Sequence, residues 1–278
     1  MTDGIRVEAP ARLHFGLIDL RGDLGRRFGG LGAALQQPRV IIEARTASKV
    51  KAFGPEAARV ARLARRFIRH HGLKQGAEIH VRQVIPRHVG LGSGTQLALA
   101  VARALAQLHG IESDPTGLAL AVGRAERSAV GTWLFHQGGF VLEGGRRRGD
   151  GAAAPLLFHQ PLPQNWRCVV AIPLVPRGLS GGSEELAFRK LSPPSAQRVG
   201  KIARLTLMAA LPALVEQDLQ TFGRAITEIQ KHVGDCFKEV QGGRFAHRKV
   251  ASLIRELGRS GAYGVGQSSW GPAVFALA

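Results

Sequence analysis

Residues 85–95 read IPRHVGLGSGT, a glycine-rich turn between two segments of different periodicity. Residues 77–85 alternate between apolar and polar side chains, which predicts a half-buried strand. Residues 95–109 carry Ala and Leu on nearly every face, which predicts a buried central helix. Backbone N–H groups in such a turn, and the positive end of the helix dipole behind it, are suited to bind a phosphate or diphosphate. A tight turn with Thr95 as a helix cap is the alternative that the spacing leaves open.

A second glycine-rich segment lies near the C-terminal end, where residues 261–272 read GAYGVGQSSWGP. It is predicted to be a loop that leads into a final strand at residues 274–277. Two such loops in one chain favour a shared cleft for an anionic ligand.

Composition narrows the class of protein. The chain has 278 residues, 45% of them hydrophobic, so a globular enzyme is expected. The formal net charge of +18 fits a polyanionic small substrate, but the basic residues are scattered, so no specific nucleic-acid partner is predicted. The sequence shows neither a membrane-spanning apolar run nor a secretion signal, which predicts a cytoplasmic protein with no membrane partner. Cys168 and Cys236 lie far apart, which argues against a disulfide framework or structural zinc.

The remaining pattern favours an α+β fold, because the predicted strands and helices do not alternate regularly. A strand pair is expected within residues 5–42, interrupted by a glycine-rich loop at residues 21–32. A domain boundary is expected in the Pro- and Gly-rich region 160–180. Further helices are predicted at residues 55–71, 116–128, 195–215, 219–233 and 247–259, and further strands at residues 140–142 and 167–173.

Three segments resemble, in order and distance, the motifs of the GHMP superfamily of small-molecule kinases: Ala9 to Leu13, Pro86 to Ser93, and Gly261 to Gly266. The middle motif departs from the usual Gly-Leu-Gly-Ser-Ser-Ala, because Ser93-Gly94-Thr95-Gln96 stands there. This variant is similar to the beta-ribofuranosylaminobenzene 5'-phosphate synthase branch. Other segments that share the resemblance are residues 12–20 (RLHFGLIDL), 27–32 (RFGGLG), 127–132 (RSAVGT), 138–140 (GGF), 241–245 (QGGRF) and 264–272 (GVGQSSWGP).

The resemblance implies a GHMP-kinase-like two-domain fold, with an N-terminal α+β domain at residues 1–165 and a C-terminal ferredoxin-like domain at residues 166–278, shortened at its end. It implies decarboxylating transfer of the phosphoribosyl group from 5-phospho-ribose 1-diphosphate to 4-aminobenzoate or 4-hydroxybenzoate, in tetrahydromethanopterin biosynthesis. Mg²⁺ is expected to assist, with no organic cofactor and with metal ligands that the sequence does not identify. A homodimer is a candidate assembly.

Several side chains are candidates for this site. Arg12 and His14 share one face of a predicted strand beside the cleft, and with Asp19 they are the predicted catalytic residues. Arg26 and Arg27 are predicted to bind the benzoate carboxylate, with a solvated loop pair as the alternative. Trp270 either stacks on the aromatic substrate or fills the domain interface. The predicted phosphate-binding residues are Gly90, Leu91, Gly92, Ser93, Gly94, Thr95, Gly264, Gly266, Gln267, Ser268 and Ser269.

A GHMP-type ATP-dependent kinase is the main alternative function, since it would share both glycine-rich segments. Such an enzyme usually carries an acid in the mid-chain segment to orient the acceptor hydroxyl. Residues 130–139 contain neither Asp nor Glu, which argues against the kinase. A nucleic-acid-binding protein is the second alternative, supported only by net charge.

Overall fold

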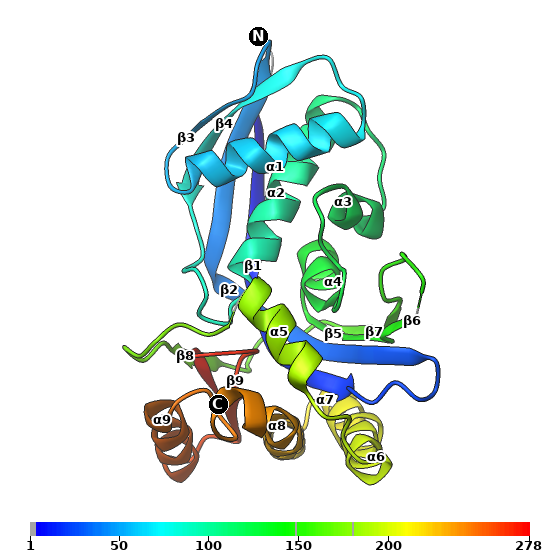
Figure 1. The fold of residues 1–278 in the computed structure, drawn as a ribbon. Coiled ribbons are helices and arrows are strands. Elements are labelled where there is room, and N and C mark those ends of the chain that lie inside the picture. Colours follow the sequence, from blue (N-terminus) through cyan, green and yellow to red (C-terminus); the bar gives the residue numbers. More distant parts are fainter. Residues whose placement is uncertain (1–3, 148, 180) are drawn as a thin grey trace.

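A long antiparallel hairpin runs through the molecule and connects its two halves. The computed structural model describes residues 4–147, 149–179 and 181–278. Strand β1 (Ile5–Asp19) pairs with β2 (Arg26–Ala47) along almost its whole length (Figure 1). The hairpin belongs to a sheet in the order β3-β4-β2-β5-β7, in which β1 and β6 also pair with β2. The other strands of this sheet are β3 (Lys51–Phe53), β4 (Gly76–Gln83), β5 (Phe140–Glu143), β6 (Arg146–Arg147) and β7 (Leu156–Gln160).

Four helices pack around the upper part of this sheet (Figure 1). Helix α2 (Ser93–Leu108) is central, because its Ala and Leu side chains are buried on nearly every face. Helix α1 (Ala57–His70) is amphipathic and buries Val60, Leu63, Ala64 and Phe67. Its arginines are exposed except for Arg59, which is partly buried. Helices α3 (Pro115–Ala121) and α4 (Val130–Gln137) complete this layer.

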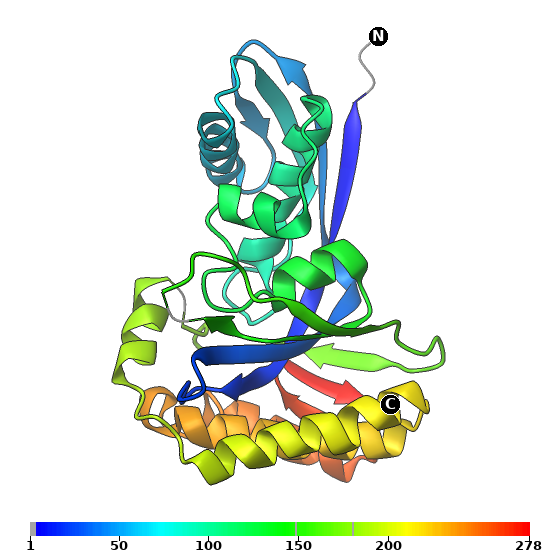
Figure 2. The ribbon, with the colours of Figure 1, turned by 90° about the vertical axis from the view of Figure 1, so that its right-hand side faces the viewer.

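A second, three-stranded sheet in the order β8-β10-β9 lies toward the other end of the hairpin. Its strands are β8 (Cys168–Ala171), β9 (Gly264–Gln267) and β10 (Val274–Leu277). Long helices form the outer layer below it, and α5 stands at one side, where the two halves meet (Figure 2). The helices of this half are α5 (Gly182–Lys190), α6 (Ala196–Leu205), the π-helical turn η1 (Thr206–Ala210), α7 (Leu211–Val215), α8 (Leu219–Gln241) and α9 (Arg248–Arg259).

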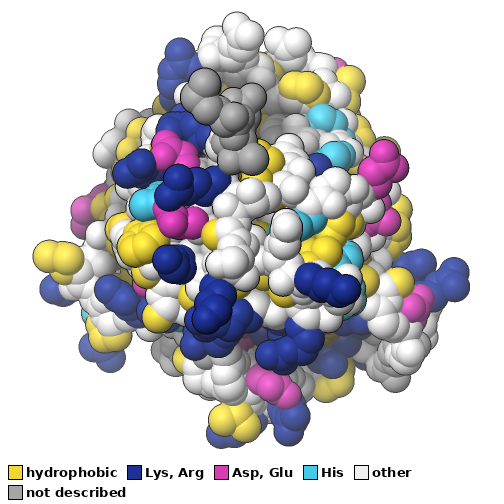
Figure 3. All heavy atoms as spheres, turned by 90° about the horizontal axis from the view of Figure 1, so that it is seen from above, with side chains coloured by type: hydrophobic (Ala, Val, Ile, Leu, Met, Phe, Trp, Pro, Cys, Tyr) yellow, Lys and Arg dark blue, Asp and Glu magenta, His cyan; other side chains and the backbone are white. Residues whose placement is uncertain are grey.

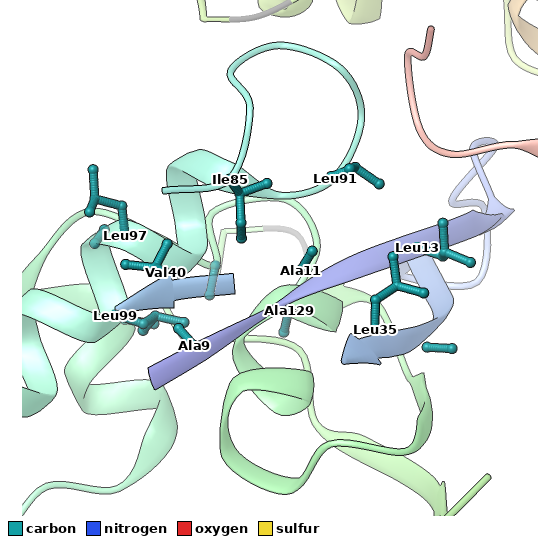
Figure 4. Close-up of a cluster of buried hydrophobic side chains, with 14 of the residues drawn as sticks. Ala9, Ala11, Leu13, Leu35, Val40, Ile85, Leu91, Leu97, Leu99 and Ala129 are labelled. Atoms are coloured by element: carbon teal, nitrogen blue, oxygen red, sulfur yellow. The ribbon is translucent and has the colours of Figure 1, made fainter. Parts of the chain in front are cut away.

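One hydrophobic core spans both halves and anchors the glycine-rich turn. Ile85 and Leu91, at the two ends of that turn, are each 1% exposed and lie over β1 beside Ala11 and Leu13 (Figure 4). The backbone N–H of Arg12 donates to Leu91 O over 3.1 Å. The turn is therefore held to β1 by apolar burial and by a backbone hydrogen bond.

The predicted α+β class is confirmed, but some predicted elements were wrong. Residues 264–267 form strand β9 and not a loop, and residues 26–32 belong to β2 and not to the loop expected at 21–32. Close packing explains both, because a Cβ on Gly264 would lie 2.6 Å from Gly223 Cα of α8, and one on Gly32 would lie 2.4 Å from Leu13 O. Glycine therefore permits close backbone contact here, whereas the sequence rule treats it as a turn signal. The helix expected at residues 116–128 ends at Ala121.

The surface charge is distributed as the sequence indicates. Lys and Arg side chains are spread over the face seen in Figure 3, with Asp and Glu between them. Within the described residues, none of the helices is long and apolar enough to cross a membrane.

Candidate active site

A cavity of about 260 Å³ lies where the two halves meet. Its walls come from β1, from the segment after α3, and from α5, α8 and the end of β9. Four arginines line it, Arg12, Arg124, Arg127 and Arg244, against two acids, Glu126 and Glu184. Arg127 pairs with Glu184 over 3.1 Å, and Arg244 pairs with Asp235 over 2.8 Å. Arg12 and Arg124 therefore remain as the lining arginines that have no ion pair within the described residues.

Arg12 forms part of the cationic end of this cavity. Its Nη1 donates to Gly90 O over 2.7 Å, so the glycine-rich turn fixes the direction of the guanidinium. Burial lowers the pKa of Arg12 to about 10, and the charge of Glu184 opposes that shift. Arg12 thus stays cationic at neutral pH in a site of reduced dielectric, where its attraction for an anion is strong.

Two further arginines converge at the N-terminus of α2. A Cβ placed on Gly94 would lie 2.9 Å from Arg59 Nη2 and 3.7 Å from Arg124 Nη2. Burial lowers the pKa of Arg124, and the nearby charge of Arg59 lowers it further. The buried Nε of Arg124 has no hydrogen-bond partner within the described residues. Two cations that repel each other beside a helix N-terminus are stabilised when an anion lies between them.

His14 occupies the middle of the cavity wall and is 8% exposed. Burial, with the charge of Arg12, lowers its pKa to about 3, so the imidazole is neutral at physiological pH. Its Nε2 lies 3.2 Å from Ser128 Oγ. A neutral imidazole can donate from one ring nitrogen and accept at the other.

A second part of the cavity wall, the aromatic end, is formed by aromatic side chains. Phe188, Phe237 and Trp270 line it and contact one another edge to face, with ring centroids 4.8–5.8 Å apart. Phe245 also lines this end, and the Arg127 guanidinium lies 5.2 Å from the centre of the Phe188 ring. Trp270 Nε1 donates to Glu184 Oε1 over 3.1 Å, which fixes the indole. Such a wall suits a planar aromatic ligand with an attached anionic group.

Ser268 connects the three sequence motifs, although it does not line the cavity. Its Oγ accepts from His14 N over 3.0 Å and donates to Gly90 O over 2.7 Å. A Cβ on Gly90 would lie 2.1 Å from Ser268 O, so only glycine allows the two segments to meet. Since its hydroxyl is occupied by these two bonds, phosphate binding by Ser268 stays a prediction.

The structure brings part of the predicted site together. Six of the candidate residues line the cavity, and they are Arg12, His14, Thr95, Gln267, Ser269 and Trp270. Those that lie in the adjoining turn and strand without lining it are Gly90, Leu91, Gly92, Ser93, Gly94, Gly264, Gly266 and Ser268. Gly264 and Gly266 pack β9 against α8, since a Cβ on Gly266 would lie 2.6 Å from Gln230 Oε1. Their contact with phosphate stays a prediction.

Asp19, Arg26 and Arg27 lie at the far end of the β1–β2 hairpin and are not among the described lining residues. Asp19 Oδ1 accepts from the N–H groups of Arg21 and Gly22 over 2.7 and 2.8 Å, which closes the hairpin turn. Arg26 donates to Gly145 O over 2.9 Å and Arg27 to Leu20 O over 3.0 Å. Their catalytic and carboxylate-binding roles stay predictions, while their observed contacts are structural.

The sequence analysis missed several residues that the fold brings to the site. These are Arg59, Arg124, Phe188, Phe237 and Arg244, with Glu143 near Ser128. Arg59 lies on α1, where helical spacing places it on the polar face of an amphipathic helix. The sequence offers no signal for Arg124, because Glu126 follows it two residues later and balances its charge locally.

Comparison with known proteins agrees with this architecture. The GHMP kinases N-terminal domain model matches residues 58–134, and the GHMP kinases C-terminal model matches residues 210–278. Homoserine kinase from Cytophaga hutchinsonii is a similar solved structure, with TM-score 0.67, 20% identity and coverage of 100% of this chain and 86% of that one. Phosphomevalonate kinase from Streptococcus pneumoniae has TM-score 0.70 and 11% identity, with coverage of 99% and 91%. Both likenesses concern the fold alone.

Closer relatives come from archaea. The beta-ribofuranosylphenol 5'-phosphate synthase of Methanothermobacter thermautotrophicus is 32% identical and covers 98% of this chain and 88% of its own length. The protein of the same name from Archaeoglobus fulgidus is 34% identical, with coverage of 98% and 87%. The chain therefore belongs to the beta-ribofuranosylphenol 5'-phosphate synthase family, within the GHMP superfamily.

Proposed function

We propose that this protein catalyses the decarboxylating transfer of the phosphoribosyl group from 5-phospho-ribose 1-diphosphate to a para-substituted benzoate, releasing diphosphate and carbon dioxide. One observation carries the proposal: a single cavity is lined both by the arginines Arg12 and Arg124 and by the aromatic side chains of Phe188, Phe237 and Trp270. The arginines suit the phosphorylated donor and the aromatic side chains suit the ring of the acceptor.

The names of the relatives favour one acceptor over the other. Both archaeal proteins are named for a ribofuranosylphenol product, which 4-hydroxybenzoate would give after loss of its carboxylate. An amino product would require 4-aminobenzoate. We propose 4-hydroxybenzoate as the preferred acceptor of this chain.

The reaction balances without a protein nucleophile. The bond between the ribosyl carbon and the diphosphate oxygen breaks, and the diphosphate leaves with that electron pair. The ring carbon that bears the carboxylate supplies electrons for the new carbon–carbon bond. The carbon–carboxylate bond then breaks, its electrons restore the aromatic ring, and carbon dioxide leaves. The role of the protein would be to hold both anions in line and to stabilise charge on the departing diphosphate.

The residues can be assigned to these tasks from their positions. Arg59, Arg124 and the N–H groups at the start of α2 would bind the donor's phosphates, and Arg12 would lie beside the leaving group. Phe188, Phe237 and Trp270 would hold the ring.

A magnesium ion fits this site only as a partner of the phosphates. Groups of three or more His, Cys, Asp or Glu that could hold a metal are not found within the described residues. Glu126 and Thr95 line the cationic end, and one carboxylate with one hydroxyl suits a Mg²⁺ ion whose other ligands are phosphate oxygens and water. The ion would offset charge on the departing diphosphate.

A kinase that transfers phosphate from ATP is the alternative, favoured by the GHMP domains. It requires a carboxylate free to orient an acceptor hydroxyl. Helix α4 contains no acid, and Glu184, one of the two acids that line the cavity, is bound to Arg127 and Trp270. The other, Glu126, is the carboxylate that we assign to Mg²⁺.

The proposal is tested by incubating the protein with Mg²⁺, 5-phospho-ribose 1-diphosphate and each benzoate. We expect carbon dioxide and diphosphate in equal amounts, with 4-hydroxybenzoate used faster than 4-aminobenzoate. Phosphorylation of a small-molecule acceptor by ATP, with no carbon dioxide from either benzoate, would replace the proposal by the kinase.

A further inference from the structure

A buried carboxyl group, that of Glu143, lies near Ser128, the hydroxyl partner of His14, and is not among the residues that line the cavity. His14 Nε2 is 3.2 Å from Ser128 Oγ. Ser128 Oγ and Glu143 Oε1 face a common point, because a Cβ built on Gly30 would lie 3.2 Å from the first and 3.0 Å from the second. The three side chains come from β1, from the segment before α4, and from the end of β5.

Glu143 is fully buried at 0% exposure and has no ion pair within the described residues. Its Oε2 accepts from Gly145 N over 2.7 Å. Its Oε1 has no well-aligned partner within the described residues, yet the Ser128 hydroxyl is close enough to oppose the rise in the pKa of Glu143. A buried carboxyl oxygen normally has a hydrogen-bond partner, and a hydroxyl can rotate to provide one.

The neighbours of Glu143 on the adjacent strands and on α4 are not ionisable, and the ionisable side chain connected to it is His14, through Ser128. Across β2 it faces Gly30, across β7 it faces Leu156, and from α4 it meets the Val130 side chain near Gly30. The backbone N–H of Gly145 binds the carboxyl, and that of Ala129 is close enough to oppose the rise in its pKa.

We propose that Glu143 is a positioning residue that determines, through the Ser128 hydroxyl, which ring nitrogen of His14 carries the proton. Glu143 touches neither the cavity nor a substrate, and it acts only through Ser128 and His14.

His14, Ser128 and Glu143 form a row of side chains in which the number of hydrogen-bond donors limits the possible arrangements. Ser128 Oγ accepts from Val130 N over 3.3 Å, so one donor and one acceptor position remain for His14 and Glu143. When Glu143 is ionised, it can only accept, so Ser128 donates to it and accepts from Nε2–H of His14. When Glu143 is protonated, it can donate to Ser128, which then donates to an unprotonated Nε2. The proton of His14 is then on Nδ1.

The two states are accessible near neutral pH. Burial raises the pKa of Glu143 to about 7, although the hydrogen bonds from Gly145, Ser128 and Ala129 oppose the rise. His14 stays neutral over that range, since its own pKa is lowered to about 3. The row therefore changes the tautomer of His14 without changing its charge.

Glu143→Gln reproduces the protonated state. The amide oxygen can keep the hydrogen bond from Gly145 N, which places the NH₂ group toward Ser128. The amide can then only donate to Ser128, as the protonated carboxyl would.

The test is nitrogen NMR of the histidine side chains, because the two ring nitrogens give different shifts in each tautomer. The chain has 10 histidines, and His14→Gln identifies the signals of His14 by their loss. In the wild type we expect mainly Nε2–H well above pH 7 and mainly Nδ1–H well below it. Glu143→Gln should show mainly Nδ1–H at both values.

Two controls separate this effect from a general disturbance. Ser128→Ala removes the connection, so adding Glu143→Gln to it should leave the tautomer unchanged. Glu43→Gln removes a carboxylate on the exposed side of β2 and should have no effect on His14. The inference is refuted if the His14 tautomer is the same in the wild type and Glu143→Gln at every pH, or if Glu143→Gln acts equally without the Ser128 hydroxyl. The readout needs no substrate, so it is independent of the proposed function.

Discussion

Replacing Glu143 by Gln should stabilise the protein at alkaline pH, although the change removes a buried charged group. Burial raises the pKa of Glu143 from 4.5 to about 7 in the folded protein. Each unit corresponds to about 1.4 kcal/mol, so the ionised carboxylate lowers the free energy of unfolding by about 3 kcal/mol. Gln keeps the shape of the side chain and the hydrogen bond from Gly145 and has no charge to bury.

The sign of the pH dependence follows from where each state holds the proton. Below about pH 4.5 the carboxyl is protonated in both states, so its contribution to stability is fully present. Between 4.5 and about 7 the unfolded chain has lost the proton and the folded protein keeps it, so the contribution declines as pH rises. Above about 7 the loss is complete and constant.

The ionisation of His14 changes the free energy of unfolding with pH in the opposite direction, and so it hides the contribution of Glu143 in the wild type. Its pKa is lowered from 6.5 to about 3, so stability is present above pH 6.5 and is lost as pH falls toward 3. Between 4.5 and 6.5 the two slopes oppose each other. The difference between the variant and the wild type cancels the contribution of His14 and isolates that of Glu143.

The assay is urea unfolding of both proteins across this pH range. The advantage of Glu143→Gln over the wild type should grow by about 3 kcal/mol between about pH 4.5 and about pH 7 and then level off. Glu43→Gln is the control, because Arg82 and Arg6 hold the pKa of that exposed carboxylate below its usual value, which gives no such rise. A constant difference between Glu143→Gln and the wild type across the window would refute the raised pKa.

Three further predictions concern the cationic end and its supports. Arg124→Gln should raise the KM for the ribosyl donor by roughly tenfold or more and weaken the thermal protection of the protein by inorganic diphosphate. The control variant Arg45→Gln, on the exposed part of β2, should change neither quantity. Gly92→Ala should lower kcat/KM by roughly ten- to a hundredfold in steady-state kinetics. The φ angle of Gly92 is +78°, and the new Cβ would lie 2.8 Å from Arg12 Cγ. Full activity would contradict the placement of Arg12. Ser268→Ala should cost about 1–3 kcal/mol in urea unfolding, since the buried N–H of His14 loses its partner and Gly90 O keeps only its bond from Arg12. Unchanged stability would show that these bonds contribute little.

The sequence predicted the parts of the fold that depend on periodicity. Helices α1, α2 and α9 appear within a few residues of the predicted ranges, because apolar side chains recur at helical spacing there. Strand β9 was not predicted, because its glycines are placed for contact with α8, a neighbour that is distant in the sequence. Local rules describe a residue's preference alone, whereas this contact depends on the packing of two elements.

Some residues of the site could likewise be predicted from the sequence, and others could not. Arg12 and Thr95 were found because they belong to motifs with a fixed spacing around the glycine-rich turn. Arg59 and Arg124 meet over Gly94 only when α1 and the segment after α3 pack against α2, so no spacing in the sequence reveals them. Glu143 directly follows the strand predicted at residues 140–142, and its burial depends on the strands on both sides of β5.

The two ends of the cavity suggest how one fold serves both kinases and this family. The start of α2 and its arginines recognise charge and tetrahedral shape, so they can hold any phosphorylated donor and do not by themselves select the reaction. The aromatic end makes the selection, because Phe188, Phe237 and Trp270 come from α5, α8 and the segment after β9, outside the turn. Their edge-to-face contacts form an apolar wall whose carboxylate neighbour, Glu184, is held by the Trp270 indole and by Arg127. We infer that such a wall binds an aromatic ring as the acceptor, which fits ribosyl transfer to a ring carbon better than phosphoryl transfer to a hydroxyl group.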